Sequence, residues 1–388
     1  MRAIVGHCQD IDTADTIADV LRQCESQLGD ERPKAGILFA STDYDHGQAL
    51  AAIRARWPGL ALIGGTTDGE VSSHAGYTPD SLLLVLLAGD DFEVELGLGR
   101  ELSADPVRAV AQATSNLRGR TPAVCLTTFA PTTNSAFVVQ ELQRAIGSPC
   151  PIVGGLSGDH RDYARMAEFC GEEHLRDSLP VLFLFGDLRV SWGVGSGWFP
   201  IGEFHRVTGS NGHVVQTIDG QPALEVFRHY WGQVNTDSLG EYPLAVYVNG
   251  TDSPHTLRAA LSCDTVTGAI RFAGDVPEGA LVRLTEVLPE GVLAGTTASI
   301  REALRNYEGS EPRVALLFSC AARRWVLGAE AEHELELLSR ELAEQARTLV
   351  DVAGFYCFGE IAPLDSGVGA TLRNGFHNET CVTVLLGK

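Results

Sequence analysis

Short apolar runs alternate with amphipathic helical patterns along this chain, and the alternation recurs three times. Each round begins with an apolar, β-rich run, continues with apolar residues spaced by three and four, and ends with two further apolar runs. The opening runs are GILFAS (36–41), AVCLTTFA (123–130) and VALLFSCAAR (314–323). Because a strand–helix–strand unit favours a parallel pair with a right-handed crossover, and the closing strands pair alongside, the pattern predicts an α/β fold. We expect mixed β-sheets flanked by helices, with recurring strand–helix–strand–strand units.

The middle of the chain departs from this pattern. The stretch 191–202, SWGVGSGWFPIG, is rich in glycine, and no helical pattern follows it. The stretch 205–220 predicts a hairpin around Asn211-Gly212, because an Asn-Gly pair favours the tight turn that joins two strands. We therefore expect two domains, 1–205 and 206–388, which is a normal division for a chain of 388 residues.

Composition narrows the classes of partner. Fifty acidic against 29 basic residues give a formal net charge of −21, which repels nucleic acid and anionic lipid, so we expect no nucleic-acid partner and no membrane insertion. The only lysines are Lys34 and Lys388, which excludes a Walker A loop and a lysine-linked cofactor unless Lys34 takes part. Nine cysteines without a CxxC pair, and no signal peptide at the N-terminus, favour a reduced, cytoplasmic protein.

Candidate chemistry gathers near the C-terminus, where polar residues stand at one end of three apolar segments. These segments are FSCAAR (318–323), GFYCFGE (354–360) and FHNET (376–380). Strand ends of this kind bring distant side chains to one edge of a sheet, so we expect a pocket there, apolar with a few convergent polar groups. The central expectation is that Arg323, Glu360 and His377 meet around one cavity.

The expected ligand is a small polar molecule with an acid group, such as an amino acid. Arg323 would clamp the carboxylate with its planar fork, and Glu360 would accept from the amine. The full set of expected ligand-binding residues is Ser319, Cys320, Arg323, Phe355, Tyr356, Gly359, Glu360, His377 and Asn378. A secondary set is Gly65, Thr66 and Glu70, since Glu70 follows Gly69 as Glu360 follows Gly359. The alternative is that these carboxylates cap backbone amides and the glycines only form turns.

The chain contains no complete catalytic or metal-binding motif. No GxSxG, HExxH or zinc-ribbon spacing occurs, so we expect no metal site and no enzymatic activity. The segment Glu332-His333-Glu334 belongs to an acidic helical pattern, which we expect to be a solvated face. One alternative is a cysteine-dependent hydrolase or transferase, with Cys320 as nucleophile and His377 as base. Another is a scaffold without a ligand.

The same segments resemble the FIST family (F-box and intracellular signal transduction proteins), which has FIST N and FIST C domains. The resemblance is carried by LIGGTTDGE (62–70) and by the three C-terminal segments, and it covers nearly the whole chain. It implies a FIST N-like domain over 1–205 and a FIST C-like ligand-binding domain over 206–388. It also implies a sensory protein that binds a small ligand reversibly.

Members of this family are thought to pass their signal to histidine kinase, cyclase or chemotaxis modules. No F-box and no output segment are recognisable in this chain, so the resemblance implies a stand-alone sensor with a separate signalling partner. We expect no cofactor. Because some relatives are associated with haem and nitric oxide, a haem-based nitric oxide sensor is a further alternative.

Overall fold

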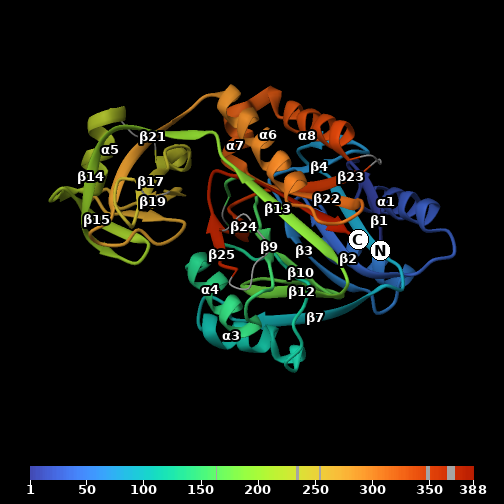
Figure 1. Ribbon diagram of the computed structural model, residues 1–388. Coiled ribbons are helices and arrows are strands. Elements are labelled where there is room, and N and C mark those ends of the chain that lie inside the picture. Colours follow the sequence, from blue (N-terminus) through green and yellow to red (C-terminus); the bar gives the residue numbers. More distant parts are fainter. Residues whose placement is uncertain (163, 233–235, 253–254, 347–349, 365–371) are drawn as a thin grey trace.

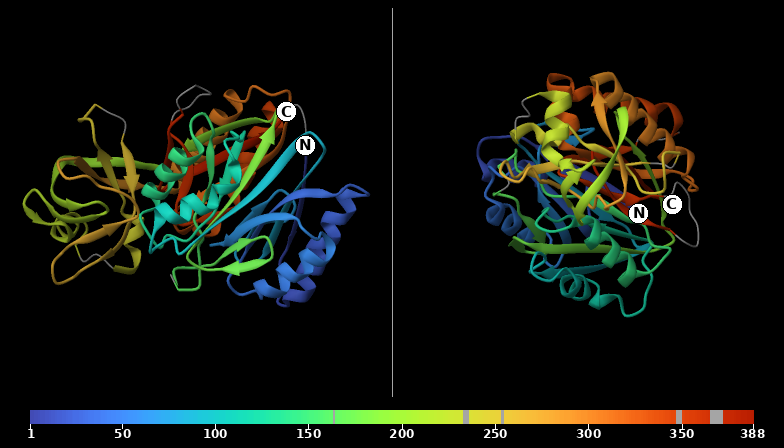
Figure 2. Two further views of the ribbon diagram at one scale, coloured as in Figure 1. Left: turned by 90° about the horizontal axis from the view of Figure 1, so that it is seen from below. Right: turned by 90° about the vertical axis from the view of Figure 1, so that its left-hand side faces the viewer.

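The molecule has a large body and a smaller lobe, which lies at the left of Figure 1. The computed structural model describes residues 1–388 with the exception of 163, 233–235, 253–254, 347–349 and 365–371, and of the side chains of 236–238. Figure 2 shows the lobe and the body side by side, with the helices on the outside of the body.

The body consists of three units of like order, each with strands, two helical connections, a two-stranded hairpin and a closing strand. The first unit comprises β1 (Arg2–Cys8), α1 (Thr13–Leu28), β2 (Pro33–Ala40), α2 (His46–Arg56), β3 (Ala61–Thr66), β4 (Glu70–Ser72), β5 (Gly76–Thr78) and β6 (Leu82–Ala88). The second comprises β7 (Phe92–Arg100), α3 (Pro106–Ala113), the 3₁₀ turn Ser115–Leu117, β8 (Val124–Thr127), α4 (Ser135–Ile146), β9 (Ile152–Gly155), β10 (Glu168–Cys170), β11 (Glu173–Leu175) and β12 (Ser178–Gly186). The third comprises β13 (Arg189–Gly195), α6 (Pro289–Arg305), β22 (Pro312–Cys320), α7 (Ala321–Leu327), the 3₁₀ turn Gly328–Glu330, α8 (Glu332–Gln345), β23 (Asp351–Cys357), β24 (Glu360–Pro363), β25 (Asn374–His377) and β26 (Cys381–Gly387).

Each unit forms the greater part of one six-stranded mixed sheet, and the last two strands of that sheet come from another unit. The strand orders are β1-β6-β2-β3-β10-β11, β7-β12-β8-β9-β24-β25 and β13-β26-β22-β23-β4-β5. In each sheet the two strands joined by the second helical connection are parallel (β2 with β3, β8 with β9, β22 with β23). The other pairs of strands are antiparallel. The α/β class, the mixed sheets and the recurring units expected from the sequence are thereby confirmed.

The hairpin of each unit completes the sheet of another unit. β4 pairs with β23, β10 with β3, and β24 with β9, so the exchange runs around all three sheets. Apolar residues of the three sheets, among them Phe39, Leu126 and Phe318, fill the space between them as one shared core. Because the parallel strands end at the same end of this core, the loops that follow them meet there.

The lobe is inserted between β13 and α6. It contains β14 (Trp198–Asn211), β15 (Val214–Ile218), β16 (Gln221–Pro222), α5 (Ala223–Trp231), the 3₁₀ helix Thr236–Glu241, β17 (Leu244–Tyr247), β18 (Thr256–Arg258), β19 (Ala260–Cys263), β20 (Ile270–Phe272) and β21 (Leu281–Val287). The hairpin predicted at Asn211-Gly212 is present, since β14 and β15 pair up to Asn211 and Val214 and Gly212 has a φ of 63°. The division expected between residues 205 and 206 falls inside β14.

No helix in the part of the chain that the structure describes is both long enough and apolar enough to cross a membrane.

Candidate functional site

Arg323 lies in a buried hydrogen-bonded network that engages its Nε and Nη2, whereas its Nη1 has no partner among the described residues. Its side chain is fully buried, and its Nη2 is 2.7 Å from Oε1 of Glu334, which is also buried. Ser319 and Tyr356 donate to the other carboxylate oxygen of Glu334 at 3.0 and 2.7 Å. Burial opposes both charges, but pairing outweighs it, so the pKa of Arg323 is raised and that of Glu334 is lowered. The expectation of a solvated Glu334 is wrong, since its side chain is buried. Ser319 and Tyr356 bond to Glu334 rather than facing an open pocket, and the ligand-binding role expected for Arg323 stays a prediction.

Glu360 is one of three buried carboxyl groups in equivalent places. Glu70, Glu168 and Glu360 each begin the first strand of an exchanged hairpin and are fully buried. Glu360 accepts from the backbone N–H and the hydroxyl of Thr380 at 3.1 and 2.6 Å, and Glu70 accepts likewise from Ser81 at 3.0 and 2.6 Å. These contacts hold the hairpin against the closing strand.

Burial raises the pKa of all three carboxyl groups, to about 8 for Glu70 and Glu360 and to about 7 for Glu168. The capping alternative stated for Glu70 and Glu360 agrees with these contacts. Both Thr380 donors bond to Oε2 of Glu360, and Sγ of Cys357 lies 3.4 Å from Oε1.

The other expected residues from this region are structural in the described chain. Phe355 packs in the shared core, with its ring 4.4 Å from that of Phe39. Gly359 has a φ of 136°, and a Cβ there would lie 2.5 Å from the ring of Phe376. A Cβ on Gly65 would lie 2.5 Å from Oγ of Ser157, and the Thr66 hydroxyl accepts from the N–H of Ala167 at 3.0 Å. The two glycines therefore allow close packing of neighbouring segments.

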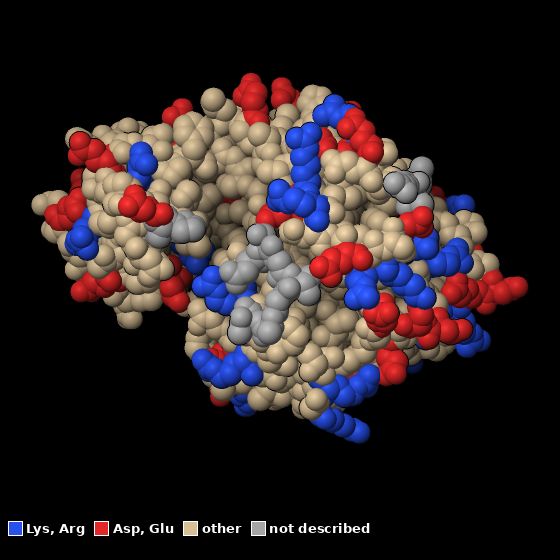
Figure 3. Space-filling model, viewed as in Figure 1, with Lys and Arg blue, Asp and Glu red and all other residues tan. Residues whose placement is uncertain are grey.

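A cavity of about 610 Å³ lies between the lobe and the body, where Figure 3 shows the surface hollowed. One wall is formed by β13 and α6, and the others by β17, β18 and the strand β25 with the residues that follow it. His377 and Asn378, two of the expected residues, line this cavity, whereas Arg323 and Glu360 do not. The structure therefore brings His377 and Asn378 together with residues that the sequence did not single out.

Arg258 is the buried cation of the cavity wall. Its Nη1 donates to the carbonyl oxygens of Leu257 and Phe376 at 2.9 and 3.2 Å, and its Nε donates to that of Asp275 at 3.2 Å. Burial lowers the pKa of Arg258 to about 10, which leaves the guanidinium charged at neutral pH. In the described part of the chain no acceptor is bonded to Nη2, so these two N–H groups can bind an anionic group in the cavity.

His377 and Asn378 add a complementary pair of polar groups. Burial lowers the pKa of His377 to about 4, so the imidazole is neutral at pH 7. Its Nε2 lies 3.1 Å from the carbonyl oxygen of Ala362 and therefore donates to it, which leaves Nδ1 as an acceptor. Asn378 accepts through Oδ1 from the N–H of Ala259 at 3.4 Å, which leaves its Nδ2 as a donor.

The surroundings of Cys320 do not favour a thiolate. The Sγ atom lies 3.7 Å from Oε2 of Glu379, and burial together with the carboxyl groups of Glu360 and Glu379 raises the pKa of the thiol well above its usual value. No hydrogen bond joins Cys320 to His377 among the residues described. Glu379 itself is buried in a left-handed conformation with a φ of 58°, and burial raises its pKa as well.

Sequence reasoning missed Arg258 and Glu302, two charged residues of the cavity lining, which also includes Arg373. Arg258 stands between apolar residues in TLRAAL, and an arginine inside an apolar strand is itself a signal of a buried, functional cation. Glu302 lies on the helix α6 among other charged residues and carries no such signal.

The described residues contain no group of three or more His, Cys, Asp and Glu side chains arranged to hold a metal ion. Haem would need an axial ligand, and the histidines that line the cavity are His255 and His377. The Nε2 of His377 donates to the carbonyl of Ala362, so haem binding rests on the family resemblance alone and stays an alternative to the expectation of no cofactor.

Comparison with known proteins agrees with the resemblance. The FIST N domain matches residues 34–221 and the FIST C domain matches residues 223–363. An uncharacterized protein of Mycobacterium bovis is 23% identical over 401 residues, which cover 99% of this chain and 98% of the relative. An uncharacterized protein of Mycobacterium tuberculosis is 25% identical over 234 residues, 58% of each chain.

Among solved structures, a cyanuric acid hydrolase from A. caulinodans aligns with 99% of this chain and 98% of its own, at 10% identity and a TM-score of 0.34. A likeness this weak carries no argument about fold or activity. The two FIST domains together span most of the chain. The protein therefore belongs to the FIST family, whose domains are generally associated with sensing in signal transduction.

Proposed function

We propose that this protein is a cytoplasmic sensor that reversibly binds a small polar ligand with an acid group, such as an amino acid, in the cavity between lobe and body. The observation that carries the proposal is the charged Arg258 side chain at the wall of the cavity, with two N–H groups left over from its backbone contacts. A guanidinium held in this way matches a carboxylate, and Asn378 adds a neighbouring donor.

The position of the cavity suits a sensor, because one ligand contacts two parts of the molecule. The lobe and the body already contact each other beside it, through Arg258 with Phe376 and through Ala259 with Asn378. A second set of contacts joins Asn134 to Asp275 at 2.6 Å and Arg161 to Glu241 at 2.9 Å. A ligand that binds one arrangement of lobe and body more tightly shifts the equilibrium between the two, and a separate signalling protein of the histidine kinase, cyclase or chemotaxis type reads the change.

Binding rather than catalysis is proposed because the nucleophile of the enzymatic alternative is a buried thiol beside two carboxyl groups. All nine cysteines are free, which supports a reducing compartment.

Calorimetric titration with the twenty L-amino acids and with simple carboxylic acids tests the proposal. Mass spectrometry of the denatured protein first establishes that no ligand has co-purified. We expect saturable heat with at least one acid, and an affinity at least about tenfold lower in Arg258→Lys, because an ammonium cannot keep the backbone contacts of Nε and Nη1 and also present the planar Nη2 donors to the carboxylate.

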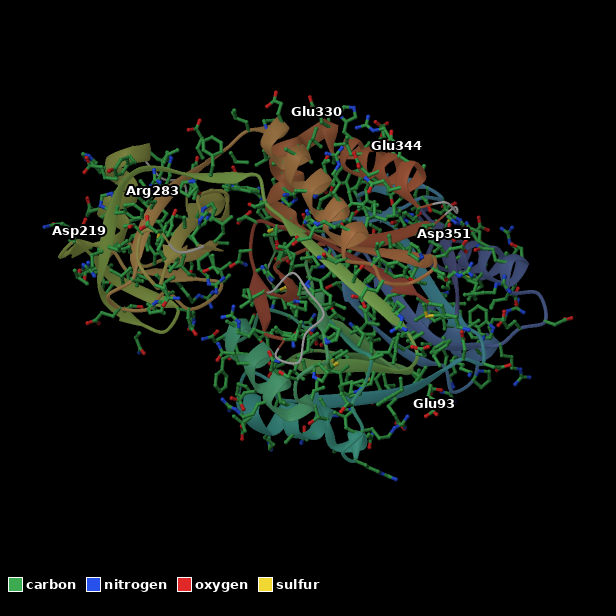
Figure 4. All side chains as sticks on the ribbon, viewed as in Figure 1. Glu93, Asp219, Arg283, Glu330, Glu344 and Asp351 are labelled. Carbon is green, nitrogen blue, oxygen red and sulfur yellow. The ribbon has the colours of Figure 1, made fainter. Side chains whose placement is uncertain are left out.

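Arg283→Lys is the matched control. The Nε of Arg283 likewise donates to a backbone carbonyl, that of Gly202 at 3.1 Å, but Arg283 lies on the lobe outside the cavity lining (Figure 4). Folded, ligand-free protein that gives no heat with any of these acids overturns the proposal.

A further inference from the structure

The three edge strands of the body offer a comparison within one molecule. Among the described residues, β1, β7 and β13 each pair with a neighbour on one side only, and side chains from a helical segment of the same unit bond to the other edge. At β1 this bonding is complete: the N–H of His7 donates to Oε1 of Gln23 at 3.0 Å, and Nε2 of Gln23 donates to the carbonyl of His7 at 3.0 Å. An amide satisfies both backbone groups because it has both an acceptor and a donor.

At β7 two amides from the helical segment divide these roles between two strand residues. Gln112 accepts from the N–H of Arg100 at 3.0 Å, and Asn116 donates to the carbonyl of Leu96 at 3.1 Å. Amide side chains thus bond to a donor and to an acceptor at each of the first two edges, on the same residue at β1 and on different residues at β7.

β13 is the exception. Val194 is the counterpart of His7, since each pairs with the second residue of its closing strand, Val382 in β26 and Leu83 in β6. The residue that bonds to it is Glu302 of α6, whose Oε2 accepts from the N–H of Val194 at 3.1 Å. A carboxylate has no donor, so it cannot bond to the carbonyl of Val194 as Gln23 bonds to that of His7.

The departure from the amide pattern occurs at the cavity wall. Val194 and Glu302 both line the cavity of about 610 Å³, and Arg258 lines it from the lobe. In a strand the N–H and C=O of one residue point to the same side, so the Val194 carbonyl faces Glu302 and the cavity. In the described part of the chain no group donates to this carbonyl and no cation pairs with Glu302.

We infer that Glu302 and the carbonyl of Val194 recognise a cationic N–H group, such as a primary ammonium, on the ligand whose acid group is held by Arg258. The inference rests on the proposed function and adds the requirement for a positive charge. A carboxylate oxygen and a carbonyl oxygen side by side are acceptors for two of the three ammonium protons. If the role of residue 302 were only to cover the strand edge, glutamine would serve both backbone groups, as it does at β1.

Titration with pairs of ligands that differ only in the amino group tests this inference. The probes are alanine with propionate, aspartate with succinate, and phenylalanine with 3-phenylpropionate. For the pair that contains a ligand, we expect the wild-type protein to bind the amino acid at least about tenfold more tightly than its partner, as a charge-assisted bond requires. Glu302→Gln should bring the two affinities to within about twofold, because an amide has no charge to attract the ammonium.

This substitution is expected to keep the fold, because Oε1 of glutamine still accepts from Val194 and its Nε2 now reaches the carbonyl. The melting temperature of Glu302→Gln should therefore equal or exceed that of the wild type. Gln23→Glu is the reciprocal control: it removes the donor to His7 at the distant edge β1, so it should lower stability and leave the affinity ratio unchanged.

The outcomes separate the two proposals. If carboxylic acids bind but the amino group makes no difference, or if Glu302→Gln keeps the wild-type ratio, the role assigned to Glu302 is overturned while the acid-binding cavity stands. If none of the acids binds to ligand-free protein, the acid-binding function fails and the role of Glu302 falls with it.

Discussion

The guanidinium of Arg323 lies 2.7 Å from the carboxylate of Glu334, and both side chains are buried. Arg323 lies on α7, which directly follows β22, and Glu334 lies on α8, which packs against β22. The pair, with the hydroxyl groups around it, fixes these helices to the third sheet. This network engages Nε and Nη2 of Arg323 and the hydroxyl groups of Ser319 and Tyr356, which the sequence alone assigns to a ligand.

Arg323→Ala is expected to lower the free energy of unfolding by about 3–5 kcal/mol, because it leaves the Glu334 carboxylate buried without its partner. Urea denaturation measures the change. Arg100→Ala is the control, since Arg100 and Glu173 pair at 50% and 52% exposure and should contribute less than about 1 kcal/mol. A stable Arg323→Ala protein that has lost only ligand binding would instead support the role of Arg323 as a carboxylate clamp.

The three buried carboxyl groups make stability depend on pH. Glu70, Glu168 and Glu360 keep their protons in the folded state up to pKa values of about 7 to 8, whereas unfolded carboxyl groups lose theirs near 4.5. Between these values the folded state binds more protons, so the free energy of unfolding falls as pH rises, by up to about 1.4 kcal/mol per pH unit for each protonated group.

Chemical denaturation between about pH 7 and 8 checks this slope, in a range where His7 and His377, whose pKa values burial lowers to about 4, are neutral in the folded state and mostly neutral in the unfolded state. Glu360→Gln keeps an acceptor for Thr380 and has no proton to lose, so its stability should fall less steeply with pH. Equal slopes in wild type and variant would contradict the raised pKa of Glu360.

Gly354 allows two parallel strands to approach each other. A Cβ at this position would lie 1.9 Å from the carbonyl oxygen of Leu317 in β22. A Cβ on Gly64 would likewise lie 1.9 Å from the carbonyl oxygen of Leu38 in β2. We expect Gly354→Ala to cost at least about 2 kcal/mol, because the strands would have to separate. Gly47→Ala, where the nearest atom is a side-chain oxygen of Asp45 at 3.3 Å, should change the melting temperature little. A Gly354→Ala protein as stable as this control would show that the strands can shift.

Thiol labelling distinguishes a binding protein from a cysteine-dependent enzyme. Cys8 and Cys263 are half-buried and the other seven cysteines are buried. Iodoacetamide near neutral pH should therefore modify these two first and Cys320 only slowly, with all nine reacting in denaturant. Mass spectrometry of tryptic peptides gives the order. Rapid, selective labelling of Cys320 would favour the hydrolase or transferase alternative.

Much of the fold could be predicted from sequence because it is local. The three strand–helix–strand rounds are visible as periodic apolar patterns, and the Asn211-Gly212 turn is fixed by its own two residues. The exchange of hairpins could not be predicted, because β4 and β10 are three residues long and carry no pattern that names a partner in another unit. The boundary expected between residues 205 and 206 falls inside β14, because the glycine-rich stretch 191–202 does not mark where β13 ends and β14 begins.

The site could be predicted in part. His377 and Asn378 are polar residues at a strand end, and they do line the cavity. Arg323 and Glu334 were misjudged because an acidic helix with Glu332, His333 and Glu334 gives no sign of which carboxylate turns inward, whereas Glu330 and Glu344 of the same region lie on the outer face (Figure 4). The role of Glu302 emerges only from comparison with Gln23, which bonds to the equivalent residue of β1, and the sequence does not show that the two positions are equivalent.

The exchange of hairpins sets the order in which a nascent chain can mature. Ser73, directly after β4, bonds to Val352, which lies 279 positions further along the chain. At ribosomal speeds the early hairpin waits tens of seconds before its partner strand is synthesised. Fragments that end before residue 350 therefore leave the edge of β4 without its partner β23, so we expect them to aggregate more readily than the complete chain.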